Sequence, residues 1–388
     1  MKAMILAAGK GTRVQPLTYA LPKPMIPILG KPVMEYLVEH LVQYDVRDIM
    51  VNVSHLHRKI EDYFGEGQRW GARIGYSFEG YATTDGTLHP VPIGSAGGIK
   101  KIQEFSGFFD ETTLVICGDA IIDLDLKAAL FEHRNKKALA SVITKEVPIA
   151  KASEYGMVVT DAEGRVLSFQ EKPRPEAALS NLASTGIYLI EPEIIDLIPS
   201  GEMFDIGSQL FPLLIEKGIP FFAQNRFFNW IDIGNVKDFW SVSQSVLRGE
   251  VAHMSMPGVE IAPGVWSGLN VHIDWHDTTI TGPVYIGSGT RIDAGTTIVG
   301  PSWIGHGSHI CSGARLVECI LFEYTRVTSG THMNGMVVCR DYCVDQHGKM
   351  MHLSESTSDA WHDARDRRSS IRLHPDKRAA AGALRAPA

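Results

Sequence analysis

The sequence predicts a Rossmann-like α/β domain with a mixed, mostly parallel sheet, followed by a parallel β-helix. Over residues 1–250, short runs of β-branched residues alternate with amphipathic stretches, as expected of parallel strands joined by helices. A glycine-rich loop directly follows the first of these strands, and over residues 257–344 aliphatic residues recur at a period of six. A period of six fits neither an α-helix nor an ordinary strand, but it fits the stacked coils of a β-helix.

Length and composition narrow the functional classes before any motif is considered. The 388 residues are enough for two domains, and the formal net charge of −7 argues against non-specific binding of nucleic acid. No apolar stretch approaches the roughly 18 residues of a membrane span, and the first residues lack the features of a signal peptide. Because the five cysteines also lack the spacing of a zinc site, we expect a cytoplasmic protein with reduced thiols and no membrane partner.

The loop after the first strand has the composition of a phosphate-binding site. Gly9 and Gly11 bracket Lys10, and Arg13 and Lys23 follow closely. Glycines let backbone N–H groups turn toward one anion, and α/β sheets bind phosphate after their first parallel strand. A dinucleotide fingerprint would need a third glycine, and a Walker loop would need Gly-Lys-Ser/Thr, so neither motif fits.

The elements that follow continue the α/β pattern. Residues 33–41 have helical spacing, and residues 48–53 form the next expected strand. Two buried strands are expected at 113–117 and 138–144, and a helix at 236–247 closes the domain near residue 250. This order predicts helices on both faces of the sheet.

The repeat region has its own signature. Its glycines and small polar residues separate aliphatic positions that resemble the hexapeptide repeat of left-handed β-helix domains. The in-phase aliphatic residues are Ile280, Ile286, Ile292, Ile298, Ile304, Ile310 and Leu316. From residue 354 to 388 the repeat fails and arginines alternate with acids, which predicts a largely disordered tail. A short helix that docks on another subunit is the alternative for this tail.

The glycine-rich loop and its surroundings resemble the signature of the sugar-phosphate nucleotidylyltransferases, also called NDP-sugar pyrophosphorylases. The family consensus is close to L-A-A-G-x-G-T-R-x-x-P-L-T followed by P-K-P, and every fixed position is present here. The resemblance implies that Arg13 acts on the pyrophosphate side of a nucleoside triphosphate and Lys23 on its α-phosphate. It also implies a nucleotide-binding role for Leu6, Ala7, Ala8, Gly9, Gly11 and Thr12.

A second segment, residues 93–99, is similar to the family's L-G-T-A-G-A-L loop. Small residues there would let a flat base lie against the backbone, with main-chain groups reading its edge. The resemblance therefore adds Gly94, Ser95, Ala96 and Gly97 to the nucleotide-binding residues.

Two aspartates are candidate metal ligands. Asp119 follows a buried strand that ends like the family's strand with Gly-Asp, and Asp232 lies in a segment that resembles W-x-D-[IV]-G. The resemblance implies that they hold Mg²⁺, which takes one or two carboxylates and completes its shell with phosphate oxygens and water. It also makes Asp119 catalytic, together with Arg13 and Lys23. The alternative for Asp119 is an N-cap of the segment that follows.

The sugar-phosphate side is expected from two further segments. Glu171 and Lys172 match the family's E-K-P, where they would accept sugar hydroxyls and bind the sugar 1-phosphate. Ser184 and Gly186 lie in a segment similar to Asn-Thr/Ala-Gly-Ile-Tyr, with Ser184 where asparagine is usual. Both are expected to contact the sugar phosphate.

The resemblance implies transfer of a nucleotidyl group from a nucleoside triphosphate to a sugar 1-phosphate. The whole chain resembles mannose-1-phosphate guanylyltransferase-like members most, which favours GTP and mannose 1-phosphate, with a glucose-1-phosphate enzyme and another nucleotide as the alternative. A regulatory paralogue that only senses nucleotide sugars, and an acyltransferase using His306, His309 or His332 of the β-helix, are the other classes. We expect a homo-oligomer assembled through residues 257–344.

Overall fold

The computed structural model describes residues 1–251, 254–352 and 360–366, and the chain divides into two compact units, Met1–Asn235 and Val236–Ala388. Each unit has its own hydrophobic core. Among the described residues, no helix is long and apolar enough to cross a membrane.

The boundary between the units lies before α7 (Val236–Leu247) rather than near residue 250 as expected. The helix belongs to the second unit because its side chains pack there. The ring of Phe239 lies 6.0 Å from that of Phe322, and Gln244 Nε2 donates to the carbonyl of Pro301 at 3.2 Å. The sequence pattern showed a helix but not the surface that its apolar face covers.

The first unit is built on a nine-stranded mixed sheet in the order β12-β11-β13-β8-β1-β4-β5, with β10 paired to β13 and β14 paired to β10. Its strands are β1 (Lys2–Leu6), β4 (Asp48–Val53), β5 (Arg73–Phe78), β8 (Thr113–Cys117), β10 (Ala140–Glu146), β11 (Gly156–Thr160), β12 (Val166–Glu171), β13 (Leu182–Ile190) and β14 (Phe221–Asn225). Strands β8, β1, β4 and β5 are parallel, whereas β13 is antiparallel to both β8 and β10. The predicted mixed, mostly parallel sheet is confirmed.

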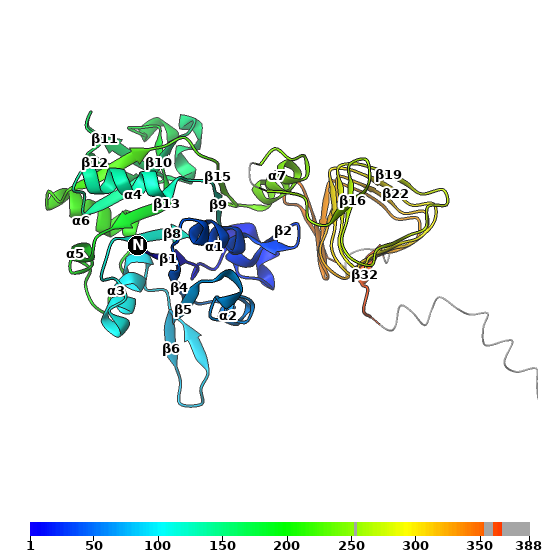
Figure 1. Cartoon of the computed structure of the whole chain (residues 1–388), viewed down its shortest axis with the longest axis horizontal. Coiled ribbons are helices and arrows are strands. Elements are labelled where there is room, and N and C mark those ends of the chain that lie inside the picture. The colour runs from blue at the N-terminus through cyan, green and yellow to red at the C-terminus, as the bar shows by residue number, and fades with distance from the viewer. Residues whose placement is uncertain (252–253, 353–359, 367–388) are drawn as a thin grey trace, which may run out of the picture. The chain divides into compact units, whose positions relative to one another are not determined.

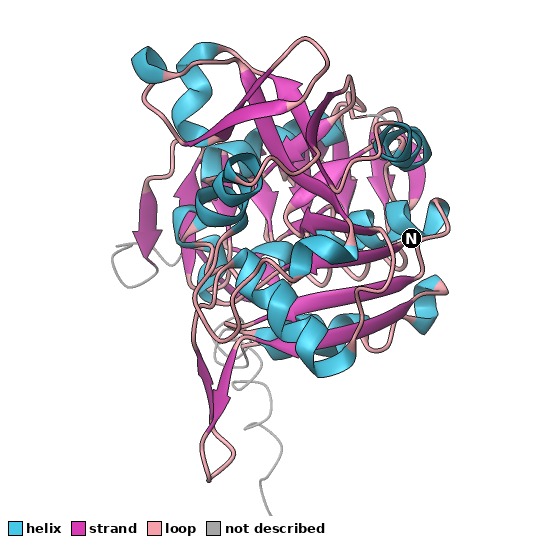
Figure 2. Cartoon of the chain, turned by 90° about the vertical axis from the view of Figure 1, so that its left-hand side faces the viewer, coloured by secondary structure: helices cyan, strands magenta, loops and turns pink. Residues whose placement is uncertain are grey.

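Helices cover both faces of this sheet, as Figure 2 shows. They are α1 (Val33–Gln43), α2 (His57–Phe64), α3 (Ser95–Ser106), α4 (Leu126–Asn135), α5 (Pro192–Ile195) and α6 (Phe211–Glu216). Alternate residues of β1 enter different cores: Ala3 and Ile5 join the core that contains α1, and Met4 joins the core that contains α3. Because successive side chains of a strand point to opposite faces, a central strand covered on both sides is apolar at every position.

Three short strand pairs complete the first unit. They are β2 (Pro27–Ile28) with β3 (Lys31–Pro32), β6 (Gly80–Ala82) with β7 (Leu88–Pro90), and β9 (Ala120–Ile122) with β15 (Trp230–Asp232). The β6–β7 hairpin extends away from the rest of its unit (Figure 1). The β9–β15 pair joins segments far apart in the sequence, and it positions the site described below.

The second unit is a β-helix with three sheets, whose successive coils pair in parallel and whose end strands pair antiparallel. The first sheet contains β16 (Val259–Ala262), β17 (Val265–Ser267), β20 (Val284–Ile286), β23 (Ser302–Ile304), β26 (Ile320–Leu321), β29 (Met336–Val338), β30 (Tyr342–Asp345) and β31 (Met350–His352). The second contains β18 (His272–Ile273), β21 (Arg291–Ile292), β24 (His309–Ile310), β27 (Thr325–Val327) and β32 (Trp361–Asp363). The third contains β19 (Thr279–Thr281), β22 (Thr297–Val299), β25 (Arg315–Val317) and β28 (His332–Asn334).

The period of six is confirmed by the packing of this unit. Ile286 pairs in register with Ile304, eighteen residues and three sides further along. The predicted aliphatic residues stack in one core, in which Ile298 is fully buried and Ile280 is partly buried. Left-handed winding of the coils stays a prediction.

The expected tail, residues 354–388, falls mostly outside the described residues. Within it, residues 360–366 are described, and there the expectation of disorder is wrong. Strand β32 pairs antiparallel with β27, and Trp361 is only 2% exposed because it packs into the aliphatic core of the β-helix. The alternative of a docking helix is not found for this segment, which is a strand on its own chain.

Candidate active site

The glycine-rich loop and the segment that carries Lys23 pack against each other at the end of β1. Gly11 has a φ of 63°, and a Cβ there would lie 3.0 Å from Thr18 Cγ2 and 3.1 Å from Lys23 Cβ. The Thr18 hydroxyl donates to the carbonyl of Gly11 at 2.9 Å, and the N–H of Ala7 donates to Asn52 Oδ1 at 2.7 Å. The fixed glycine and threonine of the signature therefore set the position of Lys23.

Two strands bring the predicted carboxylates together. Asp119 directly precedes β9, and Asp232 ends β15, where it pairs in register with Ala120. Gly118 lets the chain leave β8 close beside β1, because a Cβ at Gly118 would lie 2.8 Å from Ile5 Cγ2. The structure thus places Asp119 and Asp232 side by side, as the sequence predicted.

Lys23 lies between these carboxylates. Its Nζ forms an ion pair with Asp119 and lies 3.5 Å from Asp232 Oδ1. Burial lowers the pKa of Lys23, but the charges of Asp119 and Asp232 outweigh this effect and raise the pKa above its usual value. For Asp232, burial and then the neighbouring Asp119 raise the pKa despite the opposing charge of Lys23.

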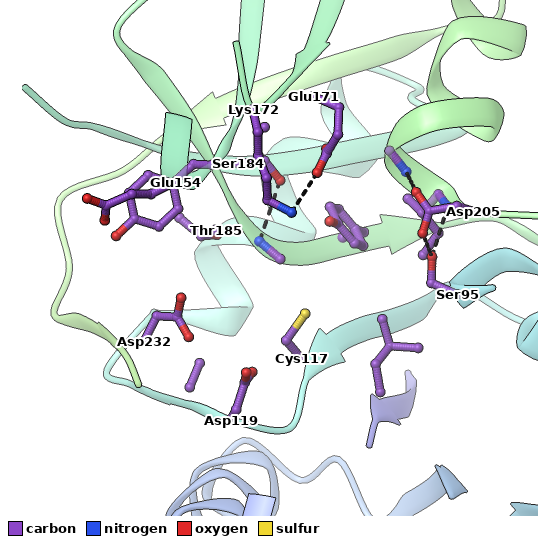
Figure 3. Close-up of a pocket in the computed structure, with 18 of the residues that line it drawn as sticks. Ser95, Cys117, Asp119, Glu154, Glu171, Lys172, Ser184, Thr185, Asp205 and Asp232 are labelled. Atoms are coloured by element: carbon purple, nitrogen blue, oxygen red, sulfur yellow. Dashed lines mark hydrogen bonds and ion pairs between the residues drawn. The ribbon is translucent and has the colours of Figure 1, made fainter. Parts of the chain in front are cut away.

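A cavity of about 280 Å³ opens beside this cluster. Figure 3 shows Asp119 and Asp232 on one side of it, with Glu171 and Lys172 across from them. The predicted site residues that line it are Leu6, Arg13, Lys23, Ser95, Asp119, Glu171, Lys172, Ser184, Gly186 and Asp232. Residues expected on the phosphate, sugar and metal sides of a reaction therefore share one chamber.

The sugar side is shaped by the ends of β12 and β13. Glu171 pairs in register with Gly156, and Lys172 Nζ lies 2.9 Å from Glu171 Oε1. Lys172 has a φ of 47°, and its N–H donates to the carbonyl of Tyr155 at 3.1 Å. On β13, Gly186 has a φ of 72°, which favours glycine and lets the strand approach β8.

A smaller cavity of about 60 Å³ adjoins the signature loop. It is lined by Leu6, Ala7, Gly9, Gly11, Lys23, Pro24 and Asp119. Two other predicted nucleotide-binding residues, Ala8 and Thr12, are not among the lining residues of either cavity. Lys10 is exposed and lines neither cavity, unlike the other two cations of the loop.

In the expected base-reading loop, residues 94–97, two main-chain N–H groups already have partners within the fold. The N–H groups of Ala96 and Gly97 both donate to the carbonyl of Phe204, at 3.0 and 2.8 Å, so they are already used within the fold. Ala96 is fully buried, and Gly94 and Gly97 lie against the backbone of residues 202–204. Of the four, Ser95 reaches the large cavity, where its hydroxyl donates to Asp205 Oδ2 at 2.8 Å.

Sequence reasoning assigned no role to about half of the cavity wall. The residues concerned are Cys117, Ala120, Glu154, Tyr155, Gly156, Phe169, Thr185, Tyr188, Asp205, Ile206, Gly207 and Trp230. The rings of Tyr155 and Trp230 lie 5.0 Å apart and form one corner. No local spacing signals this contact, because it arises from the pairing of β11 with β12 and of β9 with β15.

The carboxylate pair fits a hard divalent cation. Both donors are oxygens, both lie within reach of one cation, and the adjoining cavity leaves room for phosphate oxygens or water. In the β-helix, Asp293, His309 and Cys311 also bring ligand atoms within 4.8 Å of one another. There, however, Arg291 Nε already lies 2.8 Å from Asp293 Oδ1, which opposes a bound cation.

The histidines considered as acyltransfer bases lie in the β-helix. His309 Nε2 is 2.8 Å from Asp293 Oδ2, and His306 Nδ1 is 3.1 Å from Glu323 Oε1, whereas His332 is exposed. None of the three lines the large cavity.

Comparison with known proteins identifies similar sequences. The family model described as Nucleotidyl transferase matches residues 2–249. The UTP–glucose-1-phosphate uridylyltransferase of Synechocystis is 50% identical over 359 residues, which span 92% of each chain. The mannose-1-phosphate guanylyltransferase of Mycobacterium tuberculosis is 29% identical over 295 residues, which span 76% of this chain and 77% of that protein.

A solved structure has a similar fold. A Bacillus anthracis protein assigned as a glucose-1-phosphate thymidylyltransferase, crystallised with sucrose, superposes with a TM-score of 0.53 at 25% sequence identity. The match covers 63% of this chain and 94% of that one.

Proposed function

The chain belongs to the nucleotidyl transferase family, among the sugar-1-phosphate nucleotidylyltransferases, and from this premise we propose that it transfers uridylate from UTP to glucose 1-phosphate. The products are UDP-glucose and pyrophosphate. The observation that carries the choice of substrates is the 50% identity to a uridylyltransferase over 92% of both chains, which includes the β-helix.

The reaction needs no nucleophilic side chain. A phosphate oxygen of the sugar 1-phosphate attacks the α-phosphorus of the nucleotide, and the bond between the α-phosphorus and the bridging oxygen breaks in line. The electron pair leaves on pyrophosphate. The protein must bring two polyanions together and stabilise the charge that develops, so positioning and cations carry the catalysis.

We assign each cation of the cavity to one part of this reaction. Arg13 binds the pyrophosphate, Lys23 the α-phosphate and Lys172 the sugar phosphate, and Glu171 accepts sugar hydroxyls. The support is that all four side chains line one cavity, two of them from the 3₁₀ turns after β1 and two from the end of β12. Such an arrangement spreads positive charge along the line from sugar phosphate to leaving group.

Asp119 and Asp232 would hold Mg²⁺. When bound, the ion would supply positive charge to the phosphates of the nucleotide, where negative charge develops during the reaction. The choice of these two aspartates as metal ligands is supported by the pairing of β9 with β15, in which Asp232 lies opposite Ala120, the neighbour of Asp119. The expected cytoplasmic location and homo-oligomeric state stay predictions.

The test is a matrix of UTP, GTP, ATP, CTP and dTTP against glucose 1-phosphate and mannose 1-phosphate, read by pyrophosphate release. We expect the highest kcat/KM for UTP with glucose 1-phosphate, and none for the Asp119→Asn/Asp232→Asn variant. Measurable turnover in EDTA would contradict the metal site, and a different best pair would contradict the substrates.

GTP with mannose 1-phosphate is the second candidate. The similarity to a mannose-1-phosphate guanylyltransferase favours it, although at 29% identity over a shorter span than the uridylyltransferase match. The same matrix separates the two, because each predicts a different best pair.

A further inference from the structure

Lys23 occupies the position between the two proposed metal ligands. Its ammonium group contacts Asp119 and lies 3.5 Å from Asp232 Oδ1. The Lys23 side chain is only 13% exposed, so this is not a chance contact of a flexible surface lysine. One protein cation therefore bridges both carboxylates.

The backbone holds Lys23 in this position. It begins the short 3₁₀ helix Lys23–Met25, and Pro22 and Pro24 fix φ on either side of it. The N–H of Met25 donates to the carbonyl of Pro22 at 2.8 Å, and Ile26 donates to Lys23 at 3.1 Å. A hydrogen-bonded segment thus fixes the position of the lysine, and the paired strands β9 and β15 fix the positions of the two carboxylates.

A metal ion bound between these carboxylates would compete with Lys23 for the same position. Lys23 Nζ contacts Asp119 Oδ2 and Asp232 Oδ1, so a cation placed between these two oxygens would have to displace the ammonium group. Two cations on one carboxylate pair would also repel each other strongly in a partly buried site. The ion can enter only where the ammonium group gives way.

We propose that Lys23 is a stand-in for the metal: it holds Asp119 and Asp232 in the metal-free protein and competes with a divalent cation for them. A nucleotide would relieve this competition, because its α-phosphate offers Lys23 a new partner. The inference rests on the proposed function, since it takes the two aspartates as the metal ligands. Its consequence is that the protein alone binds metal weakly and that nucleotide binding strengthens metal binding.

Lys172 provides a matched control. It is also a lysine of the large cavity, but its Nζ pairs with Glu171 at 2.9 Å. Removing its charge changes the charge of the cavity by the same amount and leaves the carboxylate pair with its bridge. A general effect of cavity charge would appear in both variants, whereas competition for the ligands appears only at Lys23.

The test measures Mn²⁺ binding to the full chain by electron paramagnetic resonance, without nucleotide. Lys23→Met should bind Mn²⁺ on the order of tenfold or more tightly than the wild type, because a unit charge at the ligands is removed. Lys172→Met should stay within about twofold of the wild type. The gain at Lys23→Met should vanish when Asp232→Asn is added. Equal or weaker binding by Lys23→Met overturns the proposal.

Removing Lys23 leaves two carboxylates unpaired and could destabilise the protein. A second experiment therefore measures how far Mn²⁺ raises the melting temperature of each variant. Mn²⁺ should raise the melting temperature of Lys23→Met, and of Lys23→Gln measured beside it, more than that of the wild type. An equal or smaller rise in both variants counts against the stand-in role.

The outcomes separate this inference from the proposed function. Turnover that requires Mg²⁺, with no gain in metal affinity on removing Lys23, refutes the stand-in and leaves the metal site in place. If Asp232→Asn leaves the tight binding of Lys23→Met intact, the metal site itself is wrongly assigned.

Discussion

Arg13 and Lys172 line the same cavity, but their surroundings differ. Both are exposed, but Lys172 pairs with Glu171 at 2.9 Å next to the end of β12, whereas Arg13 lies in the loop that follows β1. A cation that binds the sugar phosphate stabilises the substrate complex. A cation that binds the pyrophosphate mainly stabilises the transition state, in which the leaving group gains negative charge. The two residues should therefore change different kinetic constants.

Replacing each by alanine tests this difference. Arg13→Ala should lower kcat on the order of 10²-fold, with little change in the KM for sugar 1-phosphate. Lys172→Ala should chiefly raise that KM, by roughly tenfold. Steady-state kinetics with the sugar phosphate varied at saturating nucleotide measures both. The reverse pattern would show that the roles are exchanged even though the reaction is right.

Single residues could be predicted from the sequence where their chemistry restricts the residue type, whereas contacts between distant segments could not. Asp119 and Asp232 were expected to meet, and the β9–β15 pair brings them together. Main-chain groups of residues 94–97 were expected to read a base, and two of them, the N–H groups of Ala96 and Gly97, already donate to the carbonyl of Phe204. Phe204 lies about a hundred residues away, and no local pattern announces that contact.

At the scale of elements, the β-helix was the most predictable part of the chain. Each of its short strands points one aliphatic residue inward, so the period of the sequence is the period of the structure. The β11–β12 hairpin was not predictable in the same way. Its register places Gly156 opposite Glu171 and so brings Tyr155 to the cavity, but register depends on the whole sheet.

One substitution tests the stack directly. Ile298 is fully buried and pairs with Ile280 and Leu316 on the coils beside it. Ile298→Asp should lower the free energy of unfolding of the β-helix by several kcal/mol, because it buries an unpaired carboxylate. Urea unfolding followed by circular dichroism measures this loss.

The control lies one residue away on the same strand. Thr297 is not buried, and its register partner on the next coil is Arg315. Thr297→Asp should lower the unfolding midpoint far less than Ile298→Asp, since a half-buried carboxylate opposite an exposed arginine costs little. Equal losses in both variants would mean that the inward stack is wrongly assigned.

At the scale of the whole molecule, the cavity and its predicted residues all lie within Met1–Asn235. The β-helix is a separate unit whose last described strand, β32, closes it with Trp361. The sequence missed this strand because a single tryptophan among charged residues carries no repeat signal. Assembly through the β-helix stays a prediction.

This division predicts that stability and activity can be changed separately. Trp361→Ala, or truncation after residue 353, should destabilise the β-helix by about 3 kcal/mol or more and leave kcat/KM nearly intact. Thermal unfolding and turnover of the same preparations measure the two effects. Loss of turnover at a temperature where both variants remain folded would show that the second unit contributes to catalysis.

The most direct test of the central claim is to follow the products. Full-length protein is mixed with UTP, glucose 1-phosphate and Mg²⁺, and the ³¹P resonances are recorded over time. We predict equal amounts of UDP-glucose and pyrophosphate, and neither product with Asp119→Asn/Asp232→Asn. Release of phosphate or UMP without a nucleotide sugar, or full turnover by that double variant, would contradict the account.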